Sequence, residues 1–418
     1  MSELIRSTRL DSGITVVTEE MPASHSVTIG FWVDVGSRDE EPVFAGASHF
    51  LEHLLFKGTE TRSAHEIAEA IEAVGGEMNA FTTKEYTAYY TRLLDEDLDL
   101  GLDILADIMG APAFRSDEVE AERQVILEEI LMHEDEPSDM VHDLFSAALY
   151  PGHPLGRLVL GDRSTITAMT RDQIDGYFRS HYRPSGIVVA AAGNVSHDHV
   201  VAGLQARFAG SPGPRPVRTE AALLPARPLS IFERATEQAH LVVGSRALSR
   251  NDDDRFALSV LNQVLGGGSS SRLFQEIREK RGLVYSVYSY RMAYMETGAL
   301  AIYAGTSPAR APGVLDLIDE ELDRLVQHDI TERELDVARG NLKGSLALSL
   351  EDSASRMSRL GRSQLVHGTV MPFDELAART DAVTRADVRR LAERVVGGER
   401  SLAVVGPFTE DAFAERVA

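Results

Sequence analysis

The chain carries the same run of local patterns twice, about 214 residues apart. Residues 166–182 (ITAMTRDQIDGYFRSHY) are similar to residues 380–396 (TDAVTRADVRRLAERVV), and a short apolar run and a polar turn follow each segment. Thr170 and Thr384 stand at matching helix-start positions, 214 residues apart, where a threonine hydroxyl commonly caps the first turn. A period this long predicts two tandem domains rather than a solenoid of short repeats.

Two further pairs of segments recur at nearly the same interval. LDLGLDIL (98–105) precedes APGVLDLI (311–318) by 213 residues. VTIGFWVDVGSRDE (27–40) and HLVVGSRALSRNDD (240–253) share a strand-like run followed by a polar turn. Three matches at one spacing indicate an internal duplication.

A proline-rich segment separates the two copies. Residues 211–228 (SPGPRPVRTEAALLPARP) interrupt both the helical and the strand periodicities, so we expect an extended linker there. The predicted domains are therefore residues 1–210 and residues 229–418, joined by this linker.

Each copy mixes helical and strand-like patterns. In the first copy, apolar spacing predicts helices at about 45–57, 64–74, 96–110, 117–134 and 171–181, and strands at 14–18, 26–35, 78–92 and 186–193. Because strands and helices occur in separate groups, the strands are expected to pair mostly antiparallel. The predicted fold class is α+β.

Composition excludes several classes of function. The chain has 418 residues and a formal net charge of −23, with 65 acidic against 42 basic residues. This balance disfavours nucleic-acid and anionic-membrane partners, which require a basic surface. No cysteine is present, so histidine and carboxylate are the available strong metal ligands. No signal-like or membrane-spanning apolar run is found, and we expect a cytoplasmic protein.

A short apolar helix carries three ionisable residues. In GASHFLEHLLFKG (46–58), His49 and His53 are four residues apart and so share one helix face, which Glu52 borders. This H-x-x-E-H order suits a metal held by two imidazoles with a carboxylate beside it as a proton acceptor. Hydrogen-bonded core histidines are the alternative, although three such groups on an apolar helix are costly unless something pairs with them.

A catalytic zinc needs a third protein ligand. In the helix predicted at 118–136, Glu122 and Glu129 are seven residues apart and share a face, whereas Glu128 points about 100° away from Glu129. Glu129 is therefore the expected ligand. Glu122 is expected to orient one of the histidines without binding the metal itself. His133 is the rival ligand, and a solvated acidic helix face is the alternative interpretation.

Taken together, these residues resemble the pitrilysin-type (inverzincin) zinc metallopeptidases, in a bacterial branch similar to the processing peptidases. In that family a distal glutamate follows the HxxEH motif after some 75 residues. Here His53 and Glu129 are 76 residues apart, and the segment around Glu129, ERQVILEEI, is similar to the family's segment around that glutamate. The resemblance implies one Zn²⁺ per chain, held by His49, His53 and Glu129. It also implies an endopeptidase of unfolded peptides, in which Glu52 activates the attacking water.

The same resemblance extends to two substrate-binding segments. GGEMNAFTTKEYTAYY (75–90) looks like an edge strand to which a peptide adds, with Asn79, Ala80 and Phe81 as contacts; by itself the pattern also suits an ordinary strand. In GGGSSSRLFQEIREKRGLVYSVYS (266–289), the positions of Arg278 and Tyr285 resemble those of an Arg–Tyr pair that holds the substrate in active members. A surface arginine and a core tyrosine are the alternative there.

The resemblance also implies an architecture. It implies two α/β-roll domains, each a mostly antiparallel sheet with helices on one face, that form a clam-like chamber. It implies dimers, either homodimers or heterodimers with a related subunit. The second half has no HxxEH, because its matching helix is FALSVLNQVLGGG (256–268), so we expect one metal site, in the N-terminal domain. A non-catalytic structural or assembly subunit of the same fold is the main alternative, and a metal-dependent hydrolase of small molecules is the other.

Overall fold

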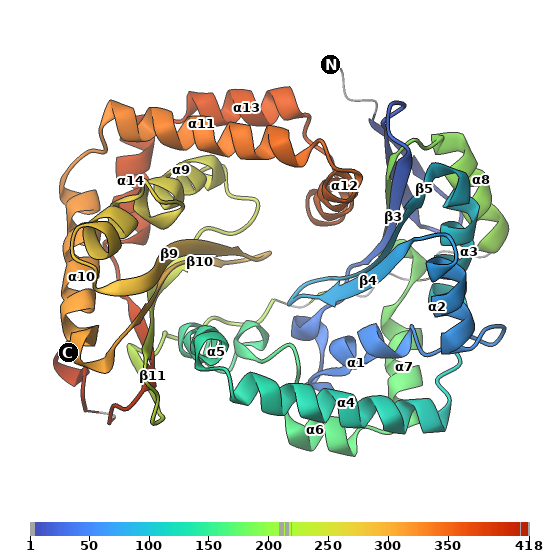
Figure 1. Ribbon diagram of the computed structural model, residues 1–418, viewed down its shortest axis with the longest axis horizontal. Coiled ribbons are helices and arrows are strands. Elements are labelled where there is room, and N and C mark those ends of the chain that lie inside the picture. The colour runs from blue at the N-terminus through green and yellow to red at the C-terminus, as the bar shows by residue number, and fades with distance from the viewer. Residues whose placement is uncertain (1–4, 209–212, 214–216, 219, 410, 417–418) are drawn as a thin grey trace. The chain divides into compact units, whose positions relative to one another are not determined.

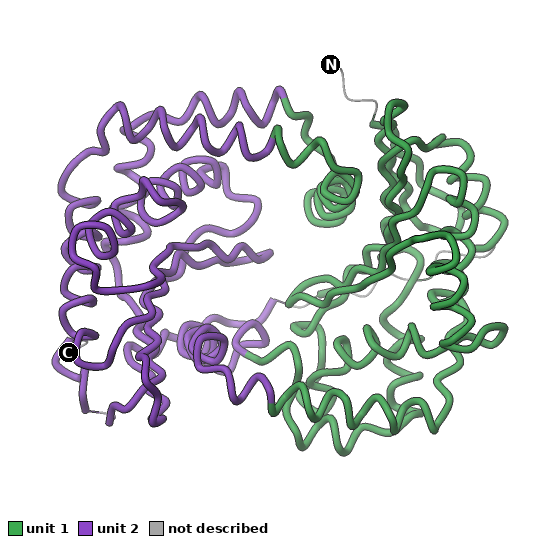
Figure 2. Tube along the Cα trace, viewed as in Figure 1, with its two compact units in different colours: residues 1–131, 157–219, 347–373 green, residues 132–156, 220–346, 374–418 purple. Residues whose placement is uncertain are grey.

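A computed structural model describes residues 5–208, 213, 217–218, 220–409 and 411–416 (Figure 1). The chain forms two compact units, each containing one β-sheet (Figure 2). Unit 1 comprises residues 1–131, 157–219 and 347–373, and unit 2 comprises residues 132–156, 220–346 and 374–418.

The sheet of unit 1 has six strands in the order β1-β2-β6-β3-β5-β4. Their bounds are β1 (Ile5–Arg9), β2 (Thr15–Glu20), β3 (Ser26–Val33), β4 (Glu77–Thr82), β5 (Thr87–Leu94) and β6 (Ile187–Gly193). All neighbouring strands pair antiparallel except β2 and β6, which are parallel. Strand β4 is therefore at the open end of the sheet.

Helices from the first half of the chain cover one face of this sheet and form much of the core of unit 1 with it. They are α1 (Ala47–Leu54), α2 (Ala64–Glu72), α3 (Leu98–Gly110), α4 (Ser116–Glu134), α6 (Arg163–Ala168), α7 (Arg171–His181) and α8 (His197–Arg207). The five predicted helices are all present, as α1, α2, α3, α4 and α7.

The sheet of unit 2 has five strands in the order β7-β11-β8-β10-β9. They are β7 (Leu229–Glu233), β8 (Ala239–Ala247), β9 (Val284–Ala293), β10 (Gly298–Thr306) and β11 (Ser401–Gly406). Its own helices are α9 (Arg255–Gly266), α10 (Ala311–Gln327), α11 (Glu332–Ser349), α13 (Phe373–Ala382) and α14 (Arg385–Val395), with a π-helical segment at Phe274–Glu279.

The two units repeat one topology. The order β2-β6-β3-β5-β4 in unit 1 becomes β7-β11-β8-β10-β9 in unit 2, and the parallel pair is the equivalent one in both sheets. Thr170 and Thr384 begin the equivalent helices α7 and α14, and each side chain accepts a hydrogen bond from the backbone N–H three residues on. The duplication predicted from the sequence is therefore confirmed at the level of topology.

Two helices belong to the unit formed mainly by the other half of the chain. Helix α5 (Pro137–Leu149), from the first half, packs on β11 and β8 of unit 2, and α12 (Ser353–His367), from the second half, packs on β3 and β6 of unit 1. The compact units thus differ from the tandem domains 1–210 and 229–418 by the exchange of these two segments.

This exchange changes the expected layering. The prediction placed helices on one face of each sheet, but both faces are covered. Along β3, Val27, Ile29 and Phe31 point into the core under α1 and α3, whereas Trp32 points to the face that α12 covers. Side chains alternate between the faces of a strand, so a strand buried at nearly every position needs a layer on each side.

Two further expectations are refined. The run 78–92 was predicted as one strand, but it is the hairpin β4–β5, because Thr83 closes a turn in which its N–H donates to the carbonyl of Tyr86. In the predicted linker 211–228, the described positions 213, 217–218 and 220–228 lie in neither helix nor strand, as expected; 211, 212, 214–216 and 219 lie outside the described residues.

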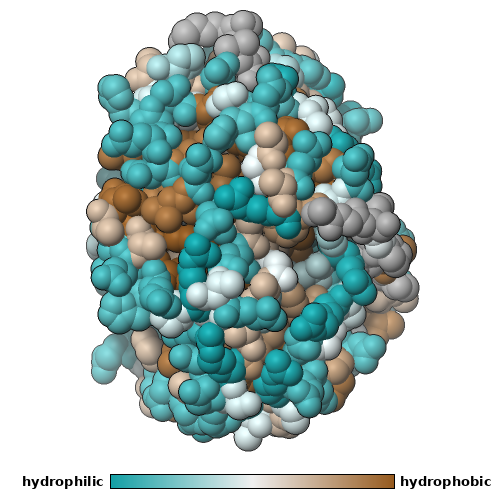
Figure 3. Space-filling model, turned by 90° about the vertical axis from the view of Figure 1, so that its right-hand side faces the viewer, coloured by the Kyte–Doolittle hydropathy of each residue, from teal (hydrophilic) through white to brown (hydrophobic). Residues whose placement is uncertain are grey.

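One face of the molecule, drawn in Figure 3, is mostly hydrophilic, with hydrophobic side chains gathered in smaller patches between the polar ones. Within the described residues, no helix is both long enough and apolar enough to cross a membrane.

Candidate metal centre

Helix α1 presents two histidines side by side. Its buried face is made by Phe50, Leu51 and Leu54, which pack into the core of unit 1. The imidazoles of His49 and His53 lie on the opposite side, with ring centroids 4.7 Å apart, as their spacing of four residues requires. Their side chains are 12% and 17% exposed, so both rings are largely shielded from water.

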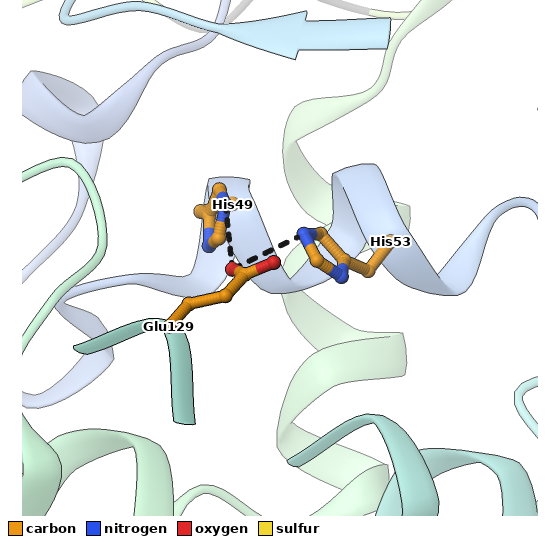
Figure 4. Close-up of side chains that lie close together, drawn as sticks. All are labelled: His49, His53 and Glu129. Atoms are coloured by element: carbon orange, nitrogen blue, oxygen red, sulfur yellow. Dashed lines mark ion pairs between the residues drawn. The ribbon is translucent and has the colours of Figure 1, made fainter. Parts of the chain in front are cut away.

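Helix α4 brings a carboxylate to these rings. The Oε2 atom of Glu129 lies 3.7 Å from Nε2 of His49 and 3.6 Å from Nε2 of His53 (Figure 4). Ligand atoms of the three residues all lie within 4.8 Å of one another. Ligands about 2.1 Å from a tetrahedral zinc are about 3.4 Å apart, so the group fits such an ion without rearrangement of the helices.

A second carboxylate from α4 fixes one of the rings. Oε1 of Glu122 lies 2.7 Å from Nδ1 of His53, and Oε2 of the same residue lies 2.7 Å from Nζ of Lys57. A bond to Nδ1 directs the other ring nitrogen, Nε2, towards Glu129. Burial opposes ionisation of Glu122, but the bonds to His53 and Lys57 outweigh it and hold the pKa of this carboxyl below its usual value.

The surroundings act in opposite directions on the two rings. Burial and then the neighbouring His53 lower the pKa of His49 to about 4, which keeps its ring neutral. Burial also lowers the pKa of His53, but the bond to Glu122 and the charges of Glu129, Glu122 and Glu52 outweigh it and raise that pKa overall. A divalent cation would supply the positive charge that these carboxylates favour.

Glu52 is close to the end of the edge strand. Thr82, the last residue of β4, acts on the Glu52 carboxyl through both its side chain and its backbone. Burial raises the pKa of Glu52 above its usual value, although Thr82 and His53 oppose this. A carboxyl with a raised pKa, on the helix that carries both histidines, suits proton transfer.

The rival ligand lies elsewhere. Nε2 of His133 is 2.9 Å from a carboxylate oxygen of Asp143, and His133 is not part of the group formed by His49, His53 and Glu129. Of the two candidates on this helix, the structure brings only Glu129 to the histidines, because it is seven residues from Glu122 and shares that face.

The predicted substrate strand has one unpaired edge among the described residues. Asn79, Ala80 and Phe81 lie on β4, which pairs with β5 alone. The backbone N–H of Ala80 donates to Oδ1 of Asn79 at 2.8 Å. The ring of Phe81 packs edge-on against Trp32, with centroids 5.6 Å apart. Phe81 therefore supports the sheet from the face opposite α1.

The predicted Arg–Tyr pair lies in unit 2. The guanidinium of Arg278 stacks over the rings of Phe274 and Tyr285, at 4.7 Å and 5.2 Å from their centroids. Tyr285 is 80% exposed, so the alternative of a core tyrosine is wrong. Arg278 is on the π-helical segment Phe274–Glu279; such segments are rare and frequent at functional sites.

Sequence reasoning did not assign Lys57 or Thr82. Lys57 lies four residues after His53, and on the helix predicted at 45–57 this spacing places it on the side of the histidines, although α1 ends at Leu54. That spacing is a signal which could have identified it. Thr82 gave no local signal, because its contact with Glu52 joins a strand end to a helix through the tertiary fold alone.

The fold is a repeated α+β unit, and one copy holds two histidines, a glutamate and a neighbouring carboxylate. This arrangement is typical of a class of metallopeptidases. Comparisons with known proteins agree. Residues 15–163 match the insulinase domain of peptidase family M16, and residues 168–342 match the inactive domain of the same family. The chain belongs to peptidase family M16.

Relatives and solved structures extend over nearly the whole chain. A protein of Streptomyces coelicolor named as an uncharacterized zinc protease is 47% identical over 97% of this chain and 90% of its own length. One of Bacillus subtilis, named in the same way, is 41% identical over 97% and 98%. The crystal structure of a protease from Helicobacter pylori shares the fold, with a TM-score of 0.88 and 24% identity over 97% of this chain and 100% of that one.

Proposed function

We propose that this protein is a zinc-dependent endopeptidase that hydrolyses unfolded peptides. The observation that carries the proposal is the meeting of His49, His53 and Glu129, whose ligand atoms lie within 4.8 Å of one another, in a chain whose relatives are named as zinc proteases. Two imidazoles and one carboxylate are the ligand set of many catalytic zinc sites. One ion per chain is expected, because the second half lacks the motif.

The residues around the site have distinct proposed roles. A zinc ion held by His49, His53 and Glu129 would make a water molecule more acidic and would polarise a carbonyl oxygen. Glu52 accepts the proton of the attacking water and passes it to the leaving amine. Thr82, which acts on the Glu52 carboxyl, ends the strand on which the peptide is expected to lie.

The substrate is proposed to add to β4 as a further strand. The open edge of β4 supplies backbone groups, which pair with any sequence, and the Asn79 amide is exposed beside them. Arg278 and Tyr285 are proposed to hold the substrate carbonyl, because such donors stabilise negative charge as it develops. The chamber, the dimer and the cytoplasmic location stay predictions.

Replacement of the proton acceptor tests the function. Glu52→Gln should retain zinc and lose peptide cleavage by about 100-fold or more, as measured by metal analysis and by mass spectrometry of a digested peptide library. The matched control is Glu69→Gln, on the exposed face of α2, which should cleave like wild type. A chelator should abolish cleavage, and added zinc should restore it.

Two results would contradict the proposed function or part of it. Freshly purified wild-type protein without metal would favour a non-catalytic assembly subunit. A Glu52→Gln variant with both its zinc and full activity would remove Glu52 from the mechanism.

A further inference from the structure

The two histidines of α1 are supported unequally. Nδ1 of His53 is bonded to Glu122 at 2.7 Å. Nδ1 of His49 is buried and has no hydrogen-bond partner among the described residues. A zinc-ligating histidine usually has its second nitrogen held by another group. The orientation of the His49 ring therefore depends on the backbone that carries it.

That backbone is held by a buried carboxylate from outside the helix. Glu40 accepts hydrogen bonds from the N–H groups of Gly46 and Ser48, each at 2.8 Å. Helix α1 begins at Ala47, so these bonds satisfy amides at its first turn, which the helix itself leaves unpaired. We call this pair of bonds the Glu40 cap.

The surroundings leave this first turn little freedom. Gly46 has a left-handed φ of 93°, and a β-carbon there would lie 2.7 Å from both the Leu160 carbonyl oxygen and the Ile166 side chain. The hydroxyl of Ser48 lies 3.3 Å from that of Tyr177. His49 directly follows Ser48, so the Glu40 cap fixes the residue before the first histidine.

A carboxylate is costly in this position. Glu40 is only 4% exposed, and burial raises its pKa to about 7, although the bonds from Ser48 and Gly46 and the charge of Arg157 oppose this. Burying such a group without a partner is unfavourable. Its described hydrogen bonds all go to the start of the metal-site helix.

We propose that Glu40 is a positioning residue of the metal site, which fixes the first turn of α1 and thereby the ring of His49. This inference rests on the proposed function, because it requires His49 to be a zinc ligand. Glu40 acts on His49 as Glu122 acts on His53, but through the backbone rather than through the ring.

The test compares Glu40→Gln with wild type in the full chain. A glutamine retains the shape but presents one acceptor oxygen where the cap needs two. We expect zinc affinity, measured by competition with a chromophoric chelator, to fall by about 10-fold or more. The visible spectrum of the Co²⁺-loaded protein should change, and with zinc in excess kcat for a peptide should fall while KM stays constant. Glu41→Gln, at the exposed neighbouring position, should behave like wild type.

The outcomes separate the two proposals. Wild-type protein that binds no zinc would overturn the proposed function, and this inference with it. If wild type binds zinc and Glu40→Gln matches its affinity and Co²⁺ spectrum, only the role of Glu40 is overturned. If Glu40→Gln does not fold, Glu40→Asp replaces it, because the shorter side chain retains the charge without reaching both amides. Unchanged zinc affinity in that variant would contradict the role of Glu40.

Discussion

At the scale of single residues, the site depends on carboxylates that do not touch the proposed ion. Glu122 joins His53 to Lys57 through its two oxygens, at 2.7 Å each. Residues that hydrogen-bond a metal ligand commonly raise the affinity for the metal, because they fix the orientation of the ligand before the ion binds. The sequence predicted this role for Glu122 from its spacing to Glu129.

We predict that Glu122→Gln weakens zinc binding by about 10-fold to 100-fold. The amide is a weaker acceptor for His53 and leaves Lys57 without its ionic partner. Zinc affinity measured by chelator competition checks this. Glu128→Gln, on the exposed side of the same helix, is the control, and an equal loss there would show that helix charge, not ring orientation, is responsible.

At the scale of elements, α12 depends on a close contact with β3. A β-carbon at Gly361 would lie 2.1 Å from Nε1 of Trp32, and that indole N–H donates to Sδ of Met357 at 3.3 Å. Glycine is thus required for the helix to approach the sheet this closely. Helix α5 packs on the sheet of unit 2 through apolar side chains, and His142 adds polar contacts with two tyrosines.

Gly361→Ala should lower the free energy of unfolding by about 1–3 kcal/mol, because the added methyl group overpacks the contact with Trp32. Trp32 is the only tryptophan of the chain, so its fluorescence during urea unfolding reports on this contact directly. Gly340→Ala, in α11 where a β-carbon meets nothing within 4 Å, should instead stabilise by about 0.5–1 kcal/mol. A neutral Gly361→Ala would mean that α12 is loosely packed.

The contact between α5 and the sheet of unit 2 should weaken in acid. His142 of α5 lies between the hydroxyls of Tyr290 and Tyr288, at 2.7 Å and 3.2 Å. Burial lowers the pKa of His142, and His240 adds to this, while the flanking Asp143 and Asp139 oppose it. The imidazole of His142 therefore binds a proton more readily in the unfolded chain than in the folded one. The contribution of His142 to stability is present above its unfolded pKa of about 6.5 and is lost as the pH falls through the lower folded value.

Urea unfolding at about pH 7.5 and about pH 5.5 checks this prediction. Wild type should lose more stability between the two pH values than His142→Gln, in which the position no longer titrates. His328→Gln, at an exposed position, should retain the wild-type dependence. Identical pH dependence in His142→Gln and wild type would contradict the assignment.

At the scale of the whole molecule, the exchanged helices make each half of the chain incomplete. Residues 132–156 belong to unit 2 and residues 347–373 belong to unit 1. Without α12, the face of sheet 1 that carries Trp32 loses its cover; without α5, the face of sheet 2 that carries Tyr303 loses its cover. Exposed apolar faces of this kind promote aggregation.

The two halves, separated within the linker 211–228 and expressed alone, should therefore bind a hydrophobic dye or aggregate, and co-expression should restore a soluble pair. As a control, a full chain cut at a protease site inserted in that linker after folding should stay together in gel filtration. If each half were soluble and monomeric without dye binding, the exchanged helices would be dispensable for the folding of each unit.

The sequence by itself determined the repeated topology, the helix starts at Thr170 and Thr384, and the face shared by His49 and His53. These features follow from local periodicity and side-chain capping, which act over a few residues. The approach of Glu129 to within 3.7 Å of both histidines, the Glu40 cap, and the exchange of α5 and α12 were decided by the tertiary structure alone. Each depends on contacts between segments far apart in the chain, and local pattern carries no information about which distant surface a segment will meet.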